Sequence, residues 1–190
     1  MYKRQRLSRR TAGRRFTRNA MMDVPELEDL GDLTGRRVLV RCDFNVPLAN
    51  GMITDDLRIR AAVPTLRYLI DAGAHVTACS HLGRPKGAQD MEYAMPSVRA
   101  RLAELVPGVE VLENLRFDAG ETANDPVFVD RLIEGQDAYV NDAFGASHRT
   151  HASVVGPPRF LPSAAGRLLA REVEVLGGLR TVSYTHLTLP

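Results

Sequence analysis

An acid and an amide follow an apolar stretch of the chain at the point where a strand should end. Residues 38–47 read V-L-V-R-C-D-F-N-V-P, and Asp43 and Asn45 come just before Pro47, which prevents a strand from continuing. A carboxylate accepts hydrogen bonds, and an amide can both donate and accept them. An acid would repel a phosphate, so this pair indicates a ligand that carries a hydroxyl group.

Arginine is the second residue type whose placement suggests chemistry. Four arginines, with three histidines among them, occupy loops or element starts: Arg58, Arg84, Arg116, Arg149, His81, His148 and His151. Guanidinium binds phosphate or carboxylate through paired N–H donors in a fixed plane. A single arginine of this kind could be a solvated loop residue or the partner of a nearby acid. Four on one edge favour a small ligand with more than one anionic group, such as a sugar or glycerate phosphate.

Other chemistries lack their sequence signals. The chain has no G-x-G-x-x-G after its first expected strand, no G-x-x-x-x-G-K-[ST] and no G-x-S-x-G. His148 and His151 lie three residues apart without a third ligand at metal spacing, so we expect no metal site. Cys42 and Cys79 fall in expected strands and are interpreted as buried, reduced thiols.

Strands and helices must bring these side chains together, and the sequence alternates between the two. Strands are expected at 37–42, 75–80, 109–112 and 137–140, with Asn50-Gly51 as a tight turn. Helices are expected from 55 or 56 to 72, with a kink or break at Pro64, and at 96–107, 126–134 and 164–176. This alternation predicts a three-layer α/β/α, Rossmann-like fold with a parallel sheet.

In a parallel sheet the carboxyl ends of all strands share one edge, which is where α/β proteins bind ligands. Asp43, His81, Arg116 and the pair Asn141-Asp142 each come at or just after an expected strand end. We therefore expect these four polar clusters to meet at one rim.

Charge divides the chain into two unlike parts. Residues 1–22 contain eight Lys or Arg and no acid, whereas residues 23–190 carry a net charge of −6. The body should therefore not bind nucleic acid through bulk charge, and no apolar run is long enough to cross a membrane. The leader lacks the apolar core of a secretory signal, which indicates a cytoplasmic protein.

The leader itself has several interpretations. Residues 1–22 show no hydrophobic periodicity and are expected to be disordered. Their composition also suits an organelle transit peptide or a nucleic-acid-binding arm. We favour a third interpretation, in which they are not native and Met21 or Met22 is the true start.

Five motifs resemble one known family. V-R-C-D-F-N-V-P-L, I-T-D-D-L-R-I-R-A-A-V-P-T-L, S-H-L-G-R-P-K-G, L-E-N-L-R-F and V-N-D-A-F-G-A-S-H-R-T-H-A-S are similar to the N-terminal domain of phosphoglycerate kinase. They occur in the family's order and spacing, from about Asp23 to Leu179. The resemblance implies the substrate-binding lobe of a two-lobed kinase, which closes at a hinge.

The resemblance also implies the ligands. Such a lobe binds 3-phosphoglycerate or 1,3-bisphosphoglycerate, and a second lobe binds Mg-ADP or Mg-ATP. The reaction is the reversible glycolytic transfer of a phosphoryl group between 1,3-bisphosphoglycerate and ADP, giving 3-phosphoglycerate and ATP. The resemblance further implies a monomer.

Residue roles follow from the matched motifs. Asp43 and Asn45 would hold the hydroxyl and carboxyl region of the glycerate. Arg58 would lie nearest the transferring phosphoryl group and stabilise its charge. The 3-phosphate would be held by His81, Arg84, Arg116 and Arg149. Phe44, Leu82, Gly83 and His151 complete the expected substrate-binding set, His151 as part of the basic patch.

The sequence departs from the family after its last expected helix. The family continues into a G-G-A-K-V segment and a nucleotide lobe, whereas here Gly177-Gly178-Leu179 is followed by an unrelated stretch, residues 180–190. We therefore expect residues 23–179 to be the phosphoglycerate-binding lobe and assign no nucleotide-binding residue. The alternative to a kinase half is an isolated, non-catalytic phosphoglycerate-binding fragment, and we expect the chain alone to be inactive.

Overall fold

A five-stranded parallel sheet forms the centre of the protein. The computed structural model describes residues 24–85 and 90–179, so the expectations for 1–22 and 180–190 concern residues outside the described part. The strands are β1 (Arg37–Cys42), β4 (His75–Cys79), β5 (Glu110–Val111), β6 (Ala138–Asp142) and β7 (Ser163–Ala165). Their order is β5-β4-β1-β6-β7, and each neighbouring pair is parallel. The predicted α/β fold with a parallel sheet is confirmed.

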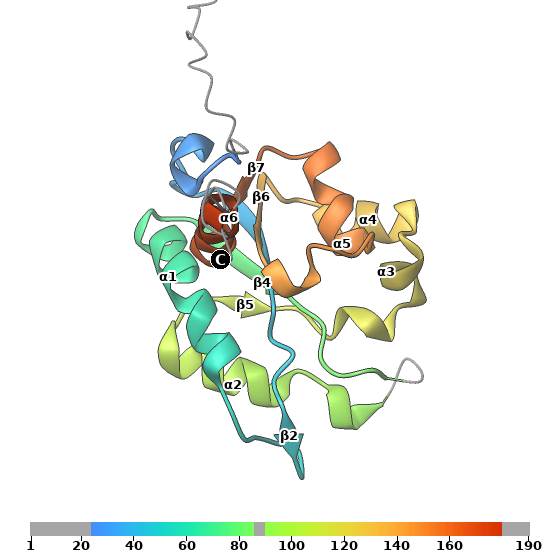
Figure 1. Cartoon of the computed structure of the whole chain (residues 1–190). Coiled ribbons are helices and arrows are strands. Elements are labelled where there is room, and N and C mark those ends of the chain that lie inside the picture. Colours follow the sequence, from blue (N-terminus) through green and yellow to red (C-terminus); the bar gives the residue numbers. More distant parts are fainter. Residues whose placement is uncertain (1–23, 86–89, 180–190) are drawn as a thin grey trace, which may run out of the picture.

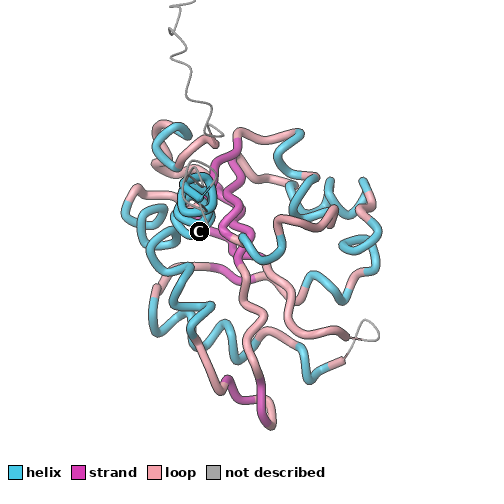
Figure 2. The backbone as a smooth tube through the Cα atoms, in the orientation of Figure 1, coloured by secondary structure: helices cyan, strands magenta, loops and turns pink. Residues whose placement is uncertain are grey.

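Helices cover both faces of this sheet (Figure 1). They are α1 (Leu57–Asp71), α2 (Pro96–Leu105), α3 (Ala119–Ala123), α4 (Pro126–Ile133), α5 (Ala152–Val155) and α6 (Arg167–Leu179). Single 3₁₀ turns lie at Leu27–Leu30, Met91–Tyr93, Leu115–Phe117, Phe144–Ala146 and Pro157–Arg159. In Figure 2 the strands of this sheet run through the middle of the molecule, with α1, α2 and α6 on one side and α3, α4 and α5 on the other.

The central strand is buried on both of its faces because helices pack against each. Val38 and Val40 belong to the core beneath α1 and α2, whereas Leu39 packs with residues of α4 on the other face. A strand in this position reads as a continuous apolar run, as 38–40 does. Arg37 precedes this run and is exposed, whereas Arg41 follows it and is fully buried.

A short hairpin leaves the sheet between β1 and α1. Its strands are β2 (Leu48–Ala49) and β3 (Met52–Ile53), which pair antiparallel. The connecting residues Asn50 and Gly51 both have positive φ, of 52° and 74°, as a two-residue hairpin turn requires. The predicted turn is confirmed.

Two features of the fold correct the sequence-based expectations. Pro64 does not divide α1 into two short helices, because the helix runs continuously over 15 residues. The helix expected at 164–176 begins later, at Arg167, because Ser163–Ala165 form β7 beside β6. A side chain at Gly166 would overlap the Asp142 carboxylate, so this glycine allows the chain to pass from β7 into α6.

Two further findings bear on the sequence analysis. Cys42 and Cys79 are buried free thiols, as expected. Among the described residues, no helix is both long enough and apolar enough to cross a membrane.

Candidate functional site

A cavity of about 270 Å³ lies at the carboxyl ends of β1, β4 and β6. Five of the residues predicted from the sequence line it: Asp43, Asn45, Arg58, His81 and Arg149. Ala61, Phe144, Gly145 and Leu168 complete the lining. Of the four polar clusters expected to meet at one rim, those of Asp43 and His81 line this cavity, whereas Arg116 and the pair Asn141-Asp142 lie outside its lining.

Asp43 and Arg58 form an ion pair in this cavity. Asp43 directly follows β1, and Arg58 is the second residue of α1. The Arg58 Nη1 donates to the Asp43 Oδ2, and the arginine side chain remains half exposed. A Cβ at Gly145 would lie 2.9 Å from the same carboxylate oxygen, so the loop after β6 approaches Asp43 closely. This places a cation and an acid side by side on the cavity wall.

Asn45 connects the end of β1 to the loop after β4. Its Oδ1 accepts a hydrogen bond of 2.7 Å from the backbone N–H of Gly83. The amide oxygen is thus committed to the fold, which leaves the Nδ2 group as a donor for a ligand. Gly83 has φ +60°, and a side chain there would overlap the ring of Tyr93. Glycine is required at this position both for its backbone conformation and for the close approach.

Asn114 positions the arginine-bearing loops, a role that we did not assign from the sequence. Its Oδ1 accepts from the backbone N–H groups of Leu82 and Arg116, at 3.2 and 3.1 Å. Its Nδ2 donates to the carbonyls of Leu82 and Tyr93, at 2.8 and 2.9 Å. The side chain is 2% exposed. A buried amide that hydrogen-bonds to four backbone groups holds these loops in place. The sequence signal for this role was the position of Asn114 in the N-L-R-F motif.

Arg116 lies beside other cations. Its Nη1 donates to the Gly83 carbonyl at 2.6 Å. Burial lowers its pKa, and the positive charges of Arg149, Arg41 and Arg84 lower it further. Within residues 24–85 and 90–179, no carboxylate lies within ion-pair distance of Arg84, Arg116 or Arg149. This part of the rim is therefore electropositive, as a site for an anion should be.

His81 lies on the cavity wall beside Arg41, and its ring is neutral at neutral pH. It is 7% exposed, and its Nδ1 lies 3.1 Å from the Nη2 of Arg41. Burial, followed by the charge of Arg41, lowers the His81 pKa to about 3. The pKa of His151 is also lowered, chiefly by burial and against the opposing effect of Glu121. At neutral pH both rings offer hydrogen bonds without adding charge.

Phe44 and Leu82 have side chains that cannot contact a ligand in this cavity. They are 0% and 1% exposed and belong to the hydrophobic core. Their expected part in substrate binding would therefore rest on their backbone groups, and it stays a prediction. Arg84, Arg116 and His151 lie outside the cavity lining, and Arg84 is exposed.

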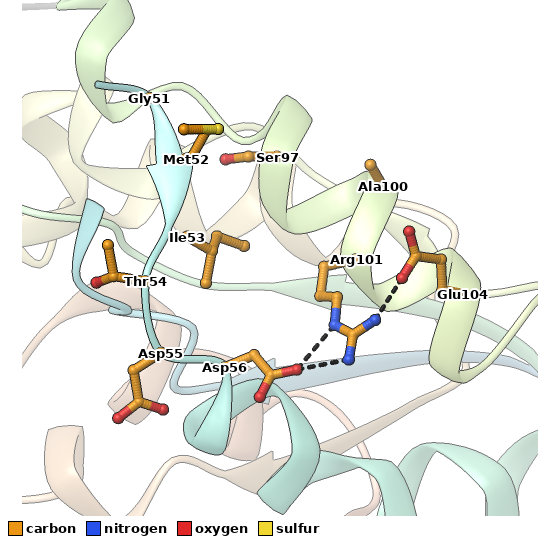
Figure 3. A pocket seen from close by; sticks show the side chains of 10 residues that line it. All are labelled: Gly51, Met52, Ile53, Thr54, Asp55, Asp56, Ser97, Ala100, Arg101 and Glu104. Carbon is orange, nitrogen blue, oxygen red and sulfur yellow. Dashed lines mark hydrogen bonds and ion pairs between the residues drawn. The ribbon is translucent and has the colours of Figure 1, made fainter. Parts of the chain in front are cut away.

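A larger cavity, of about 680 Å³, lies between the β2–β3 hairpin and α2 (Figure 3). Its one arginine, Arg101, is already bound by Asp56 and Glu104. With Asp55 also in the lining, acids outnumber bases there, so this cavity is unsuited to an anionic ligand. In the described part of the chain, no group of three or more His, Cys, Asp or Glu side chains is arranged to hold a metal ion.

Comparison with known proteins shows the family to which the chain belongs. The model of the family "Phosphoglycerate kinase" matches residues 27–111 and 107–186. The chain belongs to the phosphoglycerate kinase family. This confirms the resemblance drawn from the five motifs.

Relatives within the phosphoglycerate kinase family are similar over the same region. The phosphoglycerate kinase of Rubrobacter xylanophilus is 48% identical over an alignment that covers 83% of this chain and 46% of the relative. That of Salinispora arenicola is 49% identical, with 83% and 48% covered. The chain thus spans about half the length of the curated relatives it matches.

Solved phosphoglycerate kinase structures share the fold. The enzyme from Coxiella burnetii superposes with a TM-score of 0.75 at 34% identity, covering 80% of this chain and 44% of that one. The enzyme from Pyrococcus horikoshii gives 0.74 at 30% identity, with 85% and 46% covered. The parallel sheet and its helices are therefore the fold of one part of a phosphoglycerate kinase.

Proposed function

We propose that this chain is the phosphoglycerate-binding half of a phosphoglycerate kinase. The observation that carries the proposal is the cavity in which Asp43, Asn45, Arg58, His81 and Arg149 meet, beside arginines that have no carboxylate partner among the described residues. A ligand with a phosphate, a carboxylate and a hydroxyl matches this mixture of cations, one acid and an amide. The proposed ligands are 3-phosphoglycerate and 1,3-bisphosphoglycerate.

Different residues of the site would bind different groups of the proposed ligand. Arg84, Arg116 and Arg149 supply charge for the 3-phosphate, and His81 and His151 supply neutral N–H donors. Asp43 and the Nδ2 group of Asn45 face the hydroxyl and carboxyl region. The backbone of the loop 82–84, which Asn114 and Asn45 hold in place, lines the approach to the phosphate.

Catalysis in the full-length family member would rest on position and charge. The ionised carboxylate of 3-phosphoglycerate attacks the terminal phosphorus of ATP; the new O–P bond forms as the bond to ADP breaks, so no general base is required. Arg58, at the mouth of the cavity, would stabilise the charge of the transferring group. Mg-ATP or Mg-ADP is the second substrate, and we assign no residue of this chain to it. We further propose a cytoplasmic, monomeric protein with residues 23–179 as the binding lobe.

A second candidate is a non-catalytic module that binds phosphoglycerate. It is compatible with the described cavity, to which we assign phosphoglycerate-binding residues and no nucleotide-binding residue. Because we assign no nucleotide-binding residue to this chain, both candidates predict no turnover by the chain alone. They differ once the nucleotide-binding half of a family member is added, since a binding module would still show no ATP-dependent conversion of 3-phosphoglycerate. A coupled assay that detects turnover, lost in Arg58→Ala, would exclude the module.

Calorimetric titration of 3-phosphoglycerate into the chain tests the shared claim of binding. We expect binding in the wild type and a loss of at least about tenfold in affinity for Arg149→Ala, because a charged hydrogen bond contributes about 1.5–3 kcal/mol. Arg131→Ala is the matched control, since Arg131 is an exposed arginine that pairs with Asp118. Equal affinity in both variants, or no binding by a folded wild type, would contradict the proposal.

A further inference from the structure

A chain of buried hydrogen bonds runs from His81, on the cavity wall, to Glu121 in α3. Arg41 Nη2 lies 3.1 Å from His81 Nδ1, and Arg41 Nε donates to Ser153 Oγ at 2.9 Å. Ser153 Oγ in turn donates to Glu121 Oε1 at 2.6 Å, and the Ser153 backbone N–H donates to Glu121 Oε2 at 2.9 Å. The side chains of Arg41, Ser153 and Glu121 are fully buried.

This arrangement joins two buried charges through one hydroxyl group. A buried charge is costly unless it is paired and hydrogen-bonded. Among the described residues, Arg41 forms no direct ion pair, and Ser153 alone bridges it to the Glu121 carboxylate. Ser153 is therefore the acceptor for the cation and the donor to the anion at once. The three residues come from β1, α5 and α3, so they also tie the sheet to the helices on one face.

The direction of the hydrogen bonds determines the state of His81. A guanidinium only donates, so His81 Nδ1 must be the acceptor and the ring proton must lie on Nε2. The low pKa of His81 agrees, because burial and the adjacent Arg41 both disfavour a cationic ring. Nε2–H is then the one ring donor that His81 can offer in the cavity.

We propose that Arg41, Ser153 and Glu121 are positioning residues, which fix His81 as a neutral ring protonated at Nε2 and so supply one oriented N–H donor to the ligand. The identity of that ligand rests on the proposed function, whereas the state of the ring does not. In this arrangement the arginines provide the positive charge of the site, and His81 provides an uncharged N–H donor with a fixed orientation. The contribution of His81 to binding is then that of a neutral hydrogen bond.

The state of His81 can be read in the chain itself, without any ligand. Two-bond ¹H–¹⁵N correlation spectra of the imidazole rings, recorded at neutral pH, distinguish a protonated nitrogen from an unprotonated one. The His81 signals are assigned by their absence in His81→Gln. We expect Nδ1 to be unprotonated and Nε2 to be protonated. A ring protonated at Nδ1, or at both nitrogens, would overturn the proposal.

The role of the chain beyond His81 is tested by Ser153→Ala. Without the hydroxyl, Arg41 loses its link to Glu121, so we expect the His81 signals to change to a mixture of the two tautomers. Ser163→Ala is the matched control, because it also removes a hydrogen-bonded serine hydroxyl, which here donates to the carbonyl of Leu161. Ser153→Thr keeps a hydroxyl and should keep the wild-type signals. His81 signals that do not change in a folded Ser153→Ala would overturn the proposal.

A second variant keeps the test decisive if Ser153→Ala does not fold. Glu121→Gln retains the size of the side chain and removes its charge, and we again expect a mixture of His81 tautomers. Unchanged His81 signals in Glu121→Gln would then overturn the proposal. The wild-type spectrum decides the state of the ring in either case.

Titration of 3-phosphoglycerate separates this proposal from the proposed function. We expect Ser153→Ala to bind about tenfold more weakly than the wild type and Ser163→Ala to bind equally well. If the wild type shows the expected His81 signals but binds no 3-phosphoglycerate, the proposed function fails and the positioning role stands. If it binds 3-phosphoglycerate with a cationic His81, the proposed function stands and the positioning role fails.

Discussion

The guanidinium of Arg58 donates a hydrogen bond to the carboxylate of Asp43 across the wall of the cavity. The first residue lies at the start of α1 and the second just beyond the end of β1, so the pair joins the two elements that flank the hairpin. The Asp43 Oδ1 also accepts from the backbone N–H of Asn45, at 3.3 Å, so a ligand hydroxyl would be a third partner. A carboxylate can accept from all three, because it has two oxygens with several lone pairs.

Asp43→Asn should separate recognition of the hydroxyl from recognition of the phosphate. We expect the affinity for 3-phosphoglycerate to fall about tenfold, since a hydrogen bond to a charged acceptor contributes about 1.5 kcal/mol. The affinity for inorganic phosphate should not fall, because removing an acid reduces repulsion. Calorimetry with both ligands measures this, and Asp130→Asn, an exposed acid of α4, is the control. An equal loss of affinity for both ligands would contradict a role of Asp43 in recognising the ligand hydroxyl.

Two glycines distinguish backbone strain from a steric clash. Gly83 and Gly51 both have positive φ, but a side chain at Gly83 would overlap the ring of Tyr93, whereas no atom lies within 4 Å of a Cβ placed at Gly51. We expect Gly51→Ala to cost about 1 kcal/mol of unfolding free energy and Gly83→Ala to cost about 1–3 kcal/mol more. Urea denaturation of both variants gives the difference. Equal costs would show that the Tyr93 ring moves aside freely.

Asn114→Ala should destabilise the fold and the site together. The variant leaves the buried backbone groups of Leu82 without partners, and an unsatisfied buried group costs about 1–3 kcal/mol. We expect the free energy of unfolding to fall by about 2–4 kcal/mol and 3-phosphoglycerate binding to weaken. Denaturant titration measures the first effect and calorimetry the second. Thr122→Ala, which removes an exposed hydroxyl from α3, should change neither.

Two buried groups should affect the acid stability in opposite directions. The folded pKa of His81, about 3, lies below its unfolded value, so the unfolded chain takes up the proton first and stability is lost as the pH falls from about 6.5 towards 3. The folded pKa of Asp142, about 6, lies above its unfolded value, chiefly because of burial. Protonation of Asp142 therefore stabilises the fold as the pH falls from about 6 to 4.

Variants separate the two contributions. Asp142→Asn removes the stabilising one, so its unfolding free energy should fall more steeply with acid than that of the wild type. His81→Gln should make the dependence shallower. Urea unfolding at several pH values between about 4 and 7 measures both slopes. Identical slopes in all three proteins would contradict the raised and lowered pKa values.

Much of this architecture follows from local sequence signals. Asp125-Pro126 marks the start of α4, where the Asp125 side chain accepts from the N–H of Val127 at 2.8 Å. The strand β7 was missed because S-A-A carries no strand signal; its pairing with β6 decides its conformation. The helix α1 runs through Pro64, although local propensity disfavours proline inside a helix. Propensity does not include the packing of α1 against the rest of the fold.

For the site, too, some residues could be predicted from the sequence and others could not. Asp43, Asn45 and the arginines were predicted because they follow strand ends, which is a topological rule. The role of Arg41 was not predicted, because it sits inside an apolar strand and meets Ser153 from 112 residues further along the chain. Only the folded structure shows that this buried cation faces an acceptor rather than solvent.

The position of β1 in the middle of the sheet has a consequence for biosynthesis. β1 pairs on one side with β4 and on the other with β6, where Val38 lies beside Ala138. During translation the ribosome must therefore release the chain as far as Asp142 before both sides of β1 are occupied. Arg149, the lining cation furthest along the sequence, is released after that. A nascent chain should gain affinity for phosphoglycerate only when Arg149 has left the ribosome.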